Sequence, residues 1–162
     1  MNIKIRQAVP NDLEEITKIE SICFPKEEAA TKESLKYRIE TFPNSFFVAT
    51  YNGKIIGFVN GAVTNHNTIV DELYEAEGGH NPLGKNQSIF GLDVLPEYQR
   101  QGIAAKLMEY IMEKSKEAGR ENMILTCKDR LIHYYEKFGY ENKGVSASVH
   151  GGVVWYDMIA KL

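Results

Sequence analysis

The segment VLPEYQRQGIAAKLM, which begins at Val94, combines the residue types of an anion-binding turn. An apolar run ends at Pro96, a helical pattern follows, and Gly102 stands between them. The first N–H groups of a helix have no internal partner and lie at the positive end of its dipole, so they favour an anion. Glycine lets a phosphate approach the backbone closely, and Arg100 or Lys106 could add charge. The segment therefore predicts a phosphate site, and a turn that uses Gly102 for chain geometry is the alternative.

Two common phosphate motifs are absent from the sequence, the Walker A loop and the dinucleotide fingerprint Gly-x-Gly-x-x-Gly. Residues 99–104, QRQGIA, instead match the pattern Q/R-x-x-G-x-G/A and resemble the acyl-CoA-dependent N-acetyltransferase superfamily, known as GNAT. The resemblance implies that acetyl-CoA is the co-substrate, without a metal, and that the backbone of Leu92 and Val94 pairs with its pantetheine arm. It also implies that the amides of residues 99–105 hold the pyrophosphate. The cofactor-binding residues expected at this turn are Gln99, Arg100, Gln101, Gly102, Ile103, Ala104, Ala105 and Lys106.

Two further segments narrow the resemblance. Residues 125–144, LTCKDRLIHYYEKFGYENKG, are similar to the arylalkylamine (serotonin) N-acetyltransferase branch, whose pattern there is close to L-x-C-x-D-x-L-V-x-F-Y-x-x-F-G-F. Residues 20–49 are also similar to the amino-terminal part of that branch. Vertebrate members carry two histidines on the strand before the CoA motif, and the matching positions here are Ser88 and Phe90. The resemblance thus supports acetyl transfer but leaves the group that deprotonates the amine open.

Tyr135 is the candidate general acid. The resemblance implies that this tyrosine protonates the leaving CoA thiolate, and a phenol of pKa about 10 suits that task. Cys127 and Asp129 are also expected beside the cofactor, and core packing is the alternative for Cys127. Without the family pattern, the helical spacing of Leu131, Tyr135 and Phe138 favours a core position for the tyrosine.

The general base is not determined by the sequence. A primary amine has a pKa of about 10, so some group or water must take its proton near pH 7. Ser88 could hold a water in a relay, and His80, Glu75 or Glu77 of the polar segment that precedes it could supply a base. For each loop residue, simple solvation is the alternative. Asp93 is expected on the opposite strand face from its neighbours and is assigned a structural role.

The acceptor cleft is expected between the segment FPKEEAA, after Cys23, and the polar segment 65–87. Acidic loops attract a cationic amine, and aromatic side chains offer an apolar wall or a cation–π face. The acidic candidates are Glu27, Glu28, Asp71, Glu72, Glu75 and Glu77, and Tyr74 is a further wall residue. The substrate-binding residues expected here are Phe24, Pro25, Glu28, Phe47 and Phe90.

Periodicity predicts the order β-α-α-β-β-β-α-β-α-β-β in a single mixed α/β domain over residues 1–162. The expected sheet is mixed, with about seven strands flanked by about four helices. The resemblance adds a V-shaped split between the strands near 88–95 and 122–127. The helices are expected over 12–23, 32–40, 103–118 and 130–138, and the strands over 2–8, 88–95, 122–127, 145–149 and 153–160, with a hairpin centred on Asn52-Gly53 and a helical turn near 69–74.

Composition narrows the class of protein. The 162 residues carry a net charge of −3, which argues against a dedicated nucleic-acid binder. No apolar run approaches the roughly 18 residues of a membrane span, and the first residues show no secretory signal. Two distant cysteines without metal spacing favour a reduced, cytoplasmic protein over a disulfide. We expect a monomer or homodimer.

The leading functional hypothesis is transfer of acetyl from acetyl-CoA to the primary amine of a small, arylalkylamine-like molecule. Direct attack in a ternary complex is expected, because neither cysteine lies where an acyl-enzyme intermediate would form. A polyamine, or the amino terminus or a lysine of a protein, is the alternative acceptor. A CoA-binding module with weak catalysis is the alternative of a different class.

Overall fold

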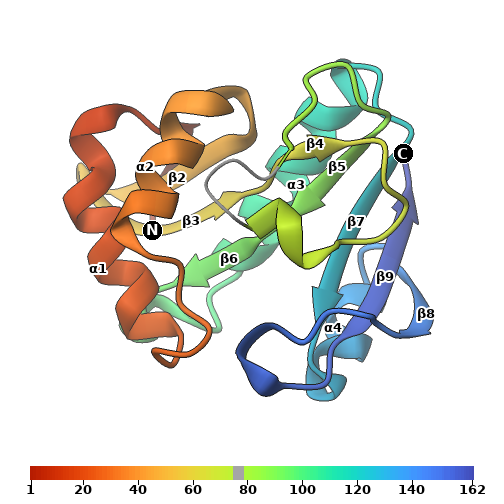
Figure 1. Ribbon diagram of the computed structural model, residues 1–162. Helices are drawn as coiled ribbons and strands as arrows, with labels where there is room; N and C mark the ends of the chain where they lie inside the picture. The colour runs from red at the N-terminus through yellow and green to blue at the C-terminus, as the bar shows by residue number, and fades with distance from the viewer. Residues whose placement is uncertain (75–78) are drawn as a thin grey trace.

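The computed structural model describes residues 1–74 and 79–162, and within them it contains nine strands and four α-helices (Figure 1). The α-helices are α1 (Leu13–Cys23), α2 (Lys32–Thr41), α3 (Ile103–Glu117) and α4 (Ile132–Glu136). The strands are β1 (Ile3–Gln7), β2 (Phe46–Tyr51), β3 (Lys54–Asn60), β4 (Val63–Thr64), β5 (Asn86–Ile89), β6 (Gly91–Val94), β7 (Asn122–Cys127), β8 (Glu141–Val145) and β9 (Tyr156–Lys161). The predicted mixed α/β class is confirmed.

The strands form two sheets, ordered β1-β2-β3-β6 and β4-β5-β7-β9-β8. The predicted strand 88–95 is divided at Phe90 into β5, which pairs in parallel with β7, and β6, which pairs antiparallel with β3. The short β4 was not predicted, and together with this division it raises the number of strands from about seven to nine. The two halves of the former strand therefore belong to different sheets, and Figure 1 shows β6 and β7 diverging.

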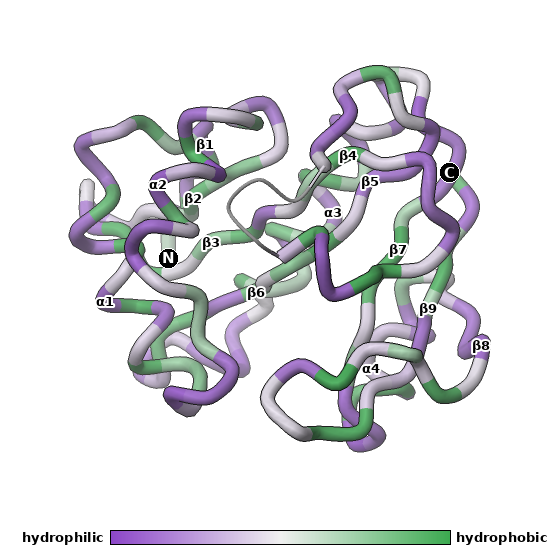
Figure 2. Tube along the Cα trace, in the orientation of Figure 1, coloured by the Kyte–Doolittle hydropathy of each residue, from purple (hydrophilic) through white to green (hydrophobic). Residues whose placement is uncertain are grey.

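Helices cover both faces of the first sheet. α1 packs on β3 and β6, whereas α3 packs on β2, β3 and β6 from the other side (Figure 1). Their buried side chains form one continuous core with the strands, which includes Ile16, Phe58, Leu107 and Met123. In Figure 2 the apolar residues of β7 are green and much of the outer loop surface is purple, as expected for an inner strand.

Local signals fixed several elements as predicted. Asn52 and Gly53 both have positive φ, 50° and 78°, and turn β2 into β3. The Oγ1 of Thr31 accepts a hydrogen bond from the Ser34 N–H and caps α2. Gly119, with φ of 81°, follows the last turn of α3.

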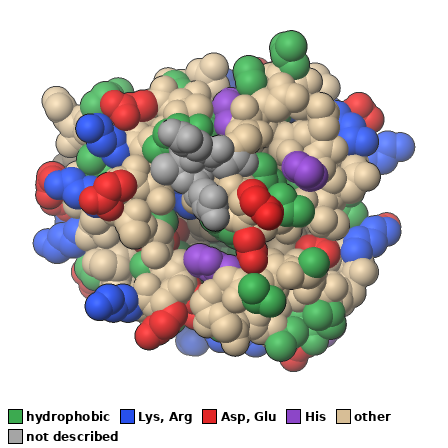
Figure 3. All heavy atoms as spheres, in the orientation of Figure 1, with side chains coloured by type: hydrophobic (Ala, Val, Ile, Leu, Met, Phe, Trp, Pro, Cys, Tyr) green, Lys and Arg blue, Asp and Glu red, His purple; other side chains and the backbone are tan. Residues whose placement is uncertain are grey.

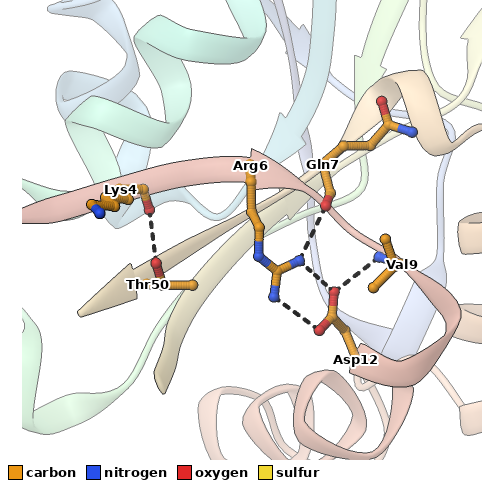
Figure 4. Close-up of polar contacts among 6 residues, drawn as sticks. All are labelled: Lys4, Arg6, Gln7, Val9, Asp12 and Thr50. Atoms are coloured by element: carbon orange, nitrogen blue, oxygen red, sulfur yellow. Dashed lines mark hydrogen bonds and ion pairs between the residues drawn. The ribbon is translucent and has the colours of Figure 1, made fainter. Parts of the chain in front are cut away.

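The entry to α1 differs from the expected capping box of Asn11 and Glu14. Asp12 holds the chain at this point instead (Figure 4). Its carboxylate accepts a hydrogen bond from the Val9 N–H at 2.9 Å and one from each terminal nitrogen of the Arg6 guanidinium, at 2.8 and 3.0 Å. Helix α1 consequently begins at Leu13.

The last hairpin also differs from the prediction. The strand expected over 145–149 lies earlier, as β8 (Glu141–Val145), and residues 146–155 form a loop with a 3₁₀ turn at His150–Gly152. The alternation V-S-A-S-V resembles a strand, but this segment has few ladder partners because β9 begins at Tyr156. The loop instead contributes Val149, His150 and Trp155 to the cavity described below.

Candidate active site

The split between β6 and β7 opens a cavity of about 510 Å³. Parallel pairing holds β5 to the first part of β7, but it stops at the pair Ile89–Leu125. Beyond this pair β6 follows β3, and the last residues of β7 face the opening. The predicted V-shaped split is thus present, limited to the second half of the predicted strand. Residues lining it that sequence reasoning had assigned to the site are Phe24, Pro25, Glu28, Phe90, Leu92, Cys127 and Tyr135.

Among the described residues, no strand pairs with the edge of β6 that faces the split. On its other side the Leu95 N–H donates to the Ile56 carbonyl at 2.9 Å. Because hydrogen-bonded and non-hydrogen-bonded pairs alternate in an antiparallel ladder, the N–H and C=O groups of Leu92 and Val94 point away from β3. The Val94 carbonyl already accepts from Gln99 Nε2 at 3.0 Å and from Cys23 Sγ at 3.4 Å. The Val94 N–H lies on the edge of β6 opposite β3, although Val94 itself does not line the cavity.

The turn that follows β6 leads into a helix where the sequence predicted one. Arg100 and Gly102 both have positive φ, 62° and 80°, and α3 begins at the next residue, Ile103. Gly102 occupies the N-cap position without a side-chain cap, so the first amides of α3 are left open. A Cβ at Gly102 would meet no atom within 4 Å.

The side chains of this turn do not all face solvent. Arg100, Gln101 and Lys106 are exposed, Ala104 and Ala105 are half-buried, and Ile103 is in the core. Ile103 can therefore serve a ligand only through its N–H. The exposed cations lie beside the open amides, as an anion site requires.

Tyr135 lies on α4, where its ring packs against Tyr134 and Tyr140 at centroid distances of 5.2 and 6.0 Å. It lines the cavity together with Cys127 of β7. Burial, reinforced by the neighbouring Cys127, raises the pKa of the Tyr135 phenol, so the hydroxyl keeps its proton at neutral pH. It is available as a proton donor.

Both thiols that line the cavity are protonated at neutral pH. Burial, followed by the charges of Asp93 and Glu20, raises the pKa of Cys23 to about 12. Burial and Asp129 raise the pKa of Cys127 to about 11. Asp129 itself is exposed at the start of a 3₁₀ turn and does not line the cavity. Neither cysteine is thus an activated nucleophile.

Three of the residues predicted for catalysis or acceptor binding lie outside the cavity lining. Ser88 is fully buried in β5, where its hydroxyl donates to the Ala62 carbonyl at 2.7 Å, so it is not placed to relay protons to a ligand. His80 accepts the Val63 N–H on Nδ1 at 3.0 Å, and burial, then Arg120, lowers its pKa. Both side chains serve the packing of the second sheet.

Phe47 is the third residue that the structure separates from the acceptor cleft. Its ring meets Tyr110 of α3 edge-on, at 4.9 Å. Alternation along β2 directs it to the α3 face, whereas the cavity lies on the side of α1 and α2. The sequence did not show which face of β2 borders the cleft.

Aromatic side chains form one wall of the cavity. Tyr74 packs against Phe90 and stacks on His150, both at 5.0 Å, and its hydroxyl lies 3.1 Å from Thr126 Oγ1. Trp155 donates its indole N–H to the His150 carbonyl at 2.8 Å. The predictions missed His150 and Trp155 because they read the final segment as two strands.

The acidic candidates are mostly held by internal contacts. Glu28 forms an ion pair with Lys128 at 2.9 Å, and its side chain is 7% exposed. Asp71 accepts hydrogen bonds from the Ser148 hydroxyl and, at 3.3 Å, from the Val149 N–H. Glu27 and Glu72 are exposed, whereas Glu75 and Glu77 lie outside the described residues. Figure 3 shows acidic side chains near the middle of this face and most Lys and Arg toward its rim.

Two buried charged residues, Glu20 and Arg38, also line the cavity, and the predictions did not include them. Glu20 Oε2 accepts the Ala30 N–H at 2.9 Å. The Arg38 guanidinium lies 4.8 Å above the Phe90 ring and donates to Asn60 Oδ1 at 3.2 Å. No sequence motif marks this pair, since it depends on how α1 and α2 pack.

A comparison with known families assigns this architecture. Residues 13–140 match the profile of the Acetyltransferase (GNAT) family. The chain belongs to this family. In the described ranges, no helix has the length and apolarity to cross a membrane, and no group of three His, Cys, Asp or Glu side chains is arranged to hold a metal.

Curated relatives of this GNAT chain share modest identity with it. The probable hydrolase YhcX of Bacillus subtilis is 28% identical over 81% of this chain and 27% of its own length. The N-acetyltransferase YkwB of the same organism is 24% identical over 88% and 67%, respectively. Serotonin N-acetyltransferase of Mesocricetus auratus is 23% identical over 68% and 52%. The chain thus spans about a quarter of the first relative's length and half to two thirds of the others.

Solved structures show the same fold. The GphF GNAT-like decarboxylase in complex with isobutyryl-CoA has a TM-score of 0.83 at 21% identity and covers 98% of both chains. The PaiA N-acetyltransferase of Thermoplasma acidophilum in complex with coenzyme A has a TM-score of 0.73 at 18% identity over 100% of both chains. At these identities the likeness concerns the fold.

Proposed function

We propose that this GNAT protein transfers acetyl from acetyl-CoA to the primary amine of a small arylalkylamine-like molecule, by direct attack in a ternary complex. The observation that carries the proposal is the unpaired edge of β6, which joins the Gly102 turn to the cavity that contains Tyr135. The turn offers amides for an anion, and the edge offers hydrogen bonds for an extended arm. The cavity offers a proton donor where that arm ends.

The donor half of the site follows from the backbone. The open amides at the start of α3, with Arg100 and Lys106 beside them, suit the pyrophosphate of coenzyme A. The free groups of Leu92 suit the amides of the pantetheine arm. In this arrangement the Val94 N–H donates to the thioester oxygen, on which negative charge develops during attack.

The acceptor half of the site is aromatic rather than acidic. Phe24, Phe90, Tyr74 and Trp155 surround the space, while Glu28 is neutralised by Lys128. A polyamine with several cationic centres would find few free carboxylates there. An amine attached to an aromatic group would bury that group against the ring wall and reach β6 with its nitrogen.

A turnover screen tests the function itself. Release of free CoA is measured with acetyl-CoA and, in turn, arylalkylamines, polyamines, aminoglycosides and peptides. We expect release with arylalkylamines and sequential kinetics that require both substrates together. Ping-pong kinetics would contradict direct attack, and binding of acetyl-CoA without release for every amine would identify a CoA-binding module instead.

Tyr135→Phe tests the role of the acid. Removing the hydroxyl should lower kcat by a factor of about 10² because the thiolate would leave unprotonated. The matched control is Tyr134→Phe, since this neighbouring phenol does not line the cavity. Wild-type kcat across the pH range in Tyr135→Phe would exclude Tyr135 as the donor.

A further inference from the structure

Four polar side chains converge beneath β6 next to the cavity: Glu20 of α1, Arg38 of α2, Asn60 of β3 and Asp93 of β6. A Cβ built on Gly91 would lie 3.1 Å from Asp93 Oδ1, 3.5 Å from Asn60 Nδ2 and 3.8 Å from Glu20 Oε1. The glycine therefore leaves room for the polar atoms beside the β6 backbone. This point is one residue from Leu92, on the edge expected to hold the donor.

Asp93 is a buried carboxyl group without a conventional donor. Its exposure is 1%, and among the described residues no N–H or O–H donates to either of its oxygens. The carboxylate of Glu20 is its polar neighbour, since Asp93 Oδ1 and Glu20 Oε1 both lie within 4 Å of the Cβ position at Gly91. Two buried carboxyl groups this close repel each other when both are ionised, so the pair favours one proton between them. Burial, and then Glu20, raises the pKa of Asp93, which identifies it as the group that holds this proton.

Glu20 is the member of the pair that reaches the ligand space. It lines the cavity, and its Oε2 is fixed by the Ala30 N–H. The other oxygen, Oε1, lies on the side of Gly91. Glu20 thus has one oxygen anchored and one directed toward the face of β6 at Gly91, which is the geometry of a positioned proton acceptor.

We propose that Glu20 accepts the proton of the attacking amine, and that Asp93, protonated and hydrogen-bonded to Glu20, positions it for this task. The inference rests on the proposed acetyl transfer. The substrate ammonium gives one proton to Glu20, and the freed nitrogen lone pair forms a bond to the thioester carbon. The C–S bond breaks, sulfur takes a proton from Tyr135, and the second proton lost by nitrogen restores the phenol through water. Glu20 releases its proton to solvent.

The charges around the pair support this assignment. The groups that face it are Cys23 of α1, Arg38 of α2, Tyr74, and Tyr135 of α4. Arg38 is the cation among them, and it lowers the pKa of Asp93 less than burial and Glu20 raise it. With one proton shared and one guanidinium nearby, the cluster is neutral before the amine binds. Asp93 is here a positioning residue, whereas Glu20 touches substrate.

The test compares two acceptors. One is an arylalkylamine, protonated at pH 7, and the other is an arylamine that is already neutral at pH 7. Glu20→Gln should lower kcat/KM for the arylalkylamine by about 10²–10⁴-fold, with recovery as the pH rises, and for the arylamine by less than about tenfold. The matched control is Glu14→Gln on the exposed side of the same helix, which should keep both activities. Asp93→Asn should show a smaller loss with the same dependence on acceptor.

Equal losses with both acceptors, or an unchanged pH profile, would overturn the role of Glu20. If Glu20→Gln does not fold, Glu20→Asp replaces it and should keep the wild-type pH profile with reduced kcat. The shared proton is checked without turnover, by infrared difference spectra at pH 7. A protonated carboxyl band that disappears in Asp93→Asn is expected, and its absence from the wild type would overturn the pair. Absence of CoA release by the wild type with both acceptors contradicts the proposed function, independently of this band.

Discussion

Asp12 and Asp93 are both buried aspartates, but their surroundings have opposite effects on the ionised form of the carboxyl group. Asp12 accepts hydrogen bonds from the Arg6 guanidinium and the Val9 N–H (Figure 4). Asp93 has the carboxylate of Glu20 as its polar contact. A carboxylate surrounded by donors organises the chain, as Asp12 does at the entry to α1. A carboxyl group without donors is costly to the fold, and such groups concentrate where chemistry needs them.

The two environments give the two groups opposite pKa shifts. Burial alone would raise the pKa of Asp12, but the hydrogen bonds from Arg6 and Val9 outweigh it and leave the pKa below the ordinary 3.8. For Asp93 burial and Glu20 act together, and its pKa lies well above 3.8. Asp12 therefore stabilises the folded protein above pH 3.8, and Asp93 destabilises it there.

The largest effect should come from removing Arg38, the arginine near the Glu20–Asp93 pair. Arg38→Met leaves the Glu20–Asp93 pair buried without its cation, and we expect a loss of about 3 kcal/mol in the free energy of unfolding at pH 7. Arg6→Met removes a partner whose side chain is 45% exposed, so its loss should be about 1 kcal/mol. Urea denaturation at pH 7 and pH 5 measures both.

The pH dependence distinguishes these two variants further. The loss in Arg38→Met should shrink toward pH 5, because protonation of the pair removes the uncompensated charge. Losses of equal size in the two variants would mean that Arg38 does not compensate the buried pair.

Asp12→Asn should have the next largest effect, a loss of about 1–2 kcal/mol at pH 7, because it weakens charge-assisted hydrogen bonds to Arg6. Since the folded-state pKa is lowered, this stabilisation is present above pH 3.8 and is lost as the pH falls through the folded value. The difference from wild type, followed by urea denaturation between pH 7 and pH 2.5, should therefore close at low pH. A constant difference would assign the role of Asp12 to shape rather than charge.

Features made by residues adjacent in sequence were predicted, whereas features made by residues distant in sequence were not. Local chemistry fixed the Asn52-Gly53 turn, the Thr31 cap and the Gly102 turn, because each depends on a few adjacent residues. The strand expected over 145–149 was misplaced because its alternation is a weak signal when the ladder partner is distant in sequence. The register of β8 on β9 was decided by tertiary pairing instead.

The residues of the candidate site likewise include some that local motifs indicated and some that only the packing brings together. Tyr135, Phe24 and Phe90 reach the cavity as the motifs indicated, but the expected bases Ser88 and His80 do not. The Glu20–Asp93 contact joins residues more than seventy positions apart and depends on the packing of α1 against β6. A helix glutamate and a strand aspartate carry no local pattern that predicts their meeting.

Asp93→Asn should have the smallest effect on stability and the opposite sign, a gain of about 0.5–1 kcal/mol at pH 7. Below pH 3.8 Asp93 is protonated in both the folded and the unfolded protein and imposes no cost. As the pH rises above 3.8 the unfolded chain releases the proton while the folded chain keeps it, so unfolding becomes easier until the folded-state pKa is passed. Asparagine can donate to Glu20 as the protonated carboxyl does, without that cost. Urea denaturation should measure the free energy of unfolding of this variant and of Asp12→Asn as a function of pH. Above pH 3.8 we expect a value above wild type for Asp93→Asn and below wild type for Asp12→Asn. A loss in both variants would show that Asp93 is ionised and held by contacts like those of Asp12.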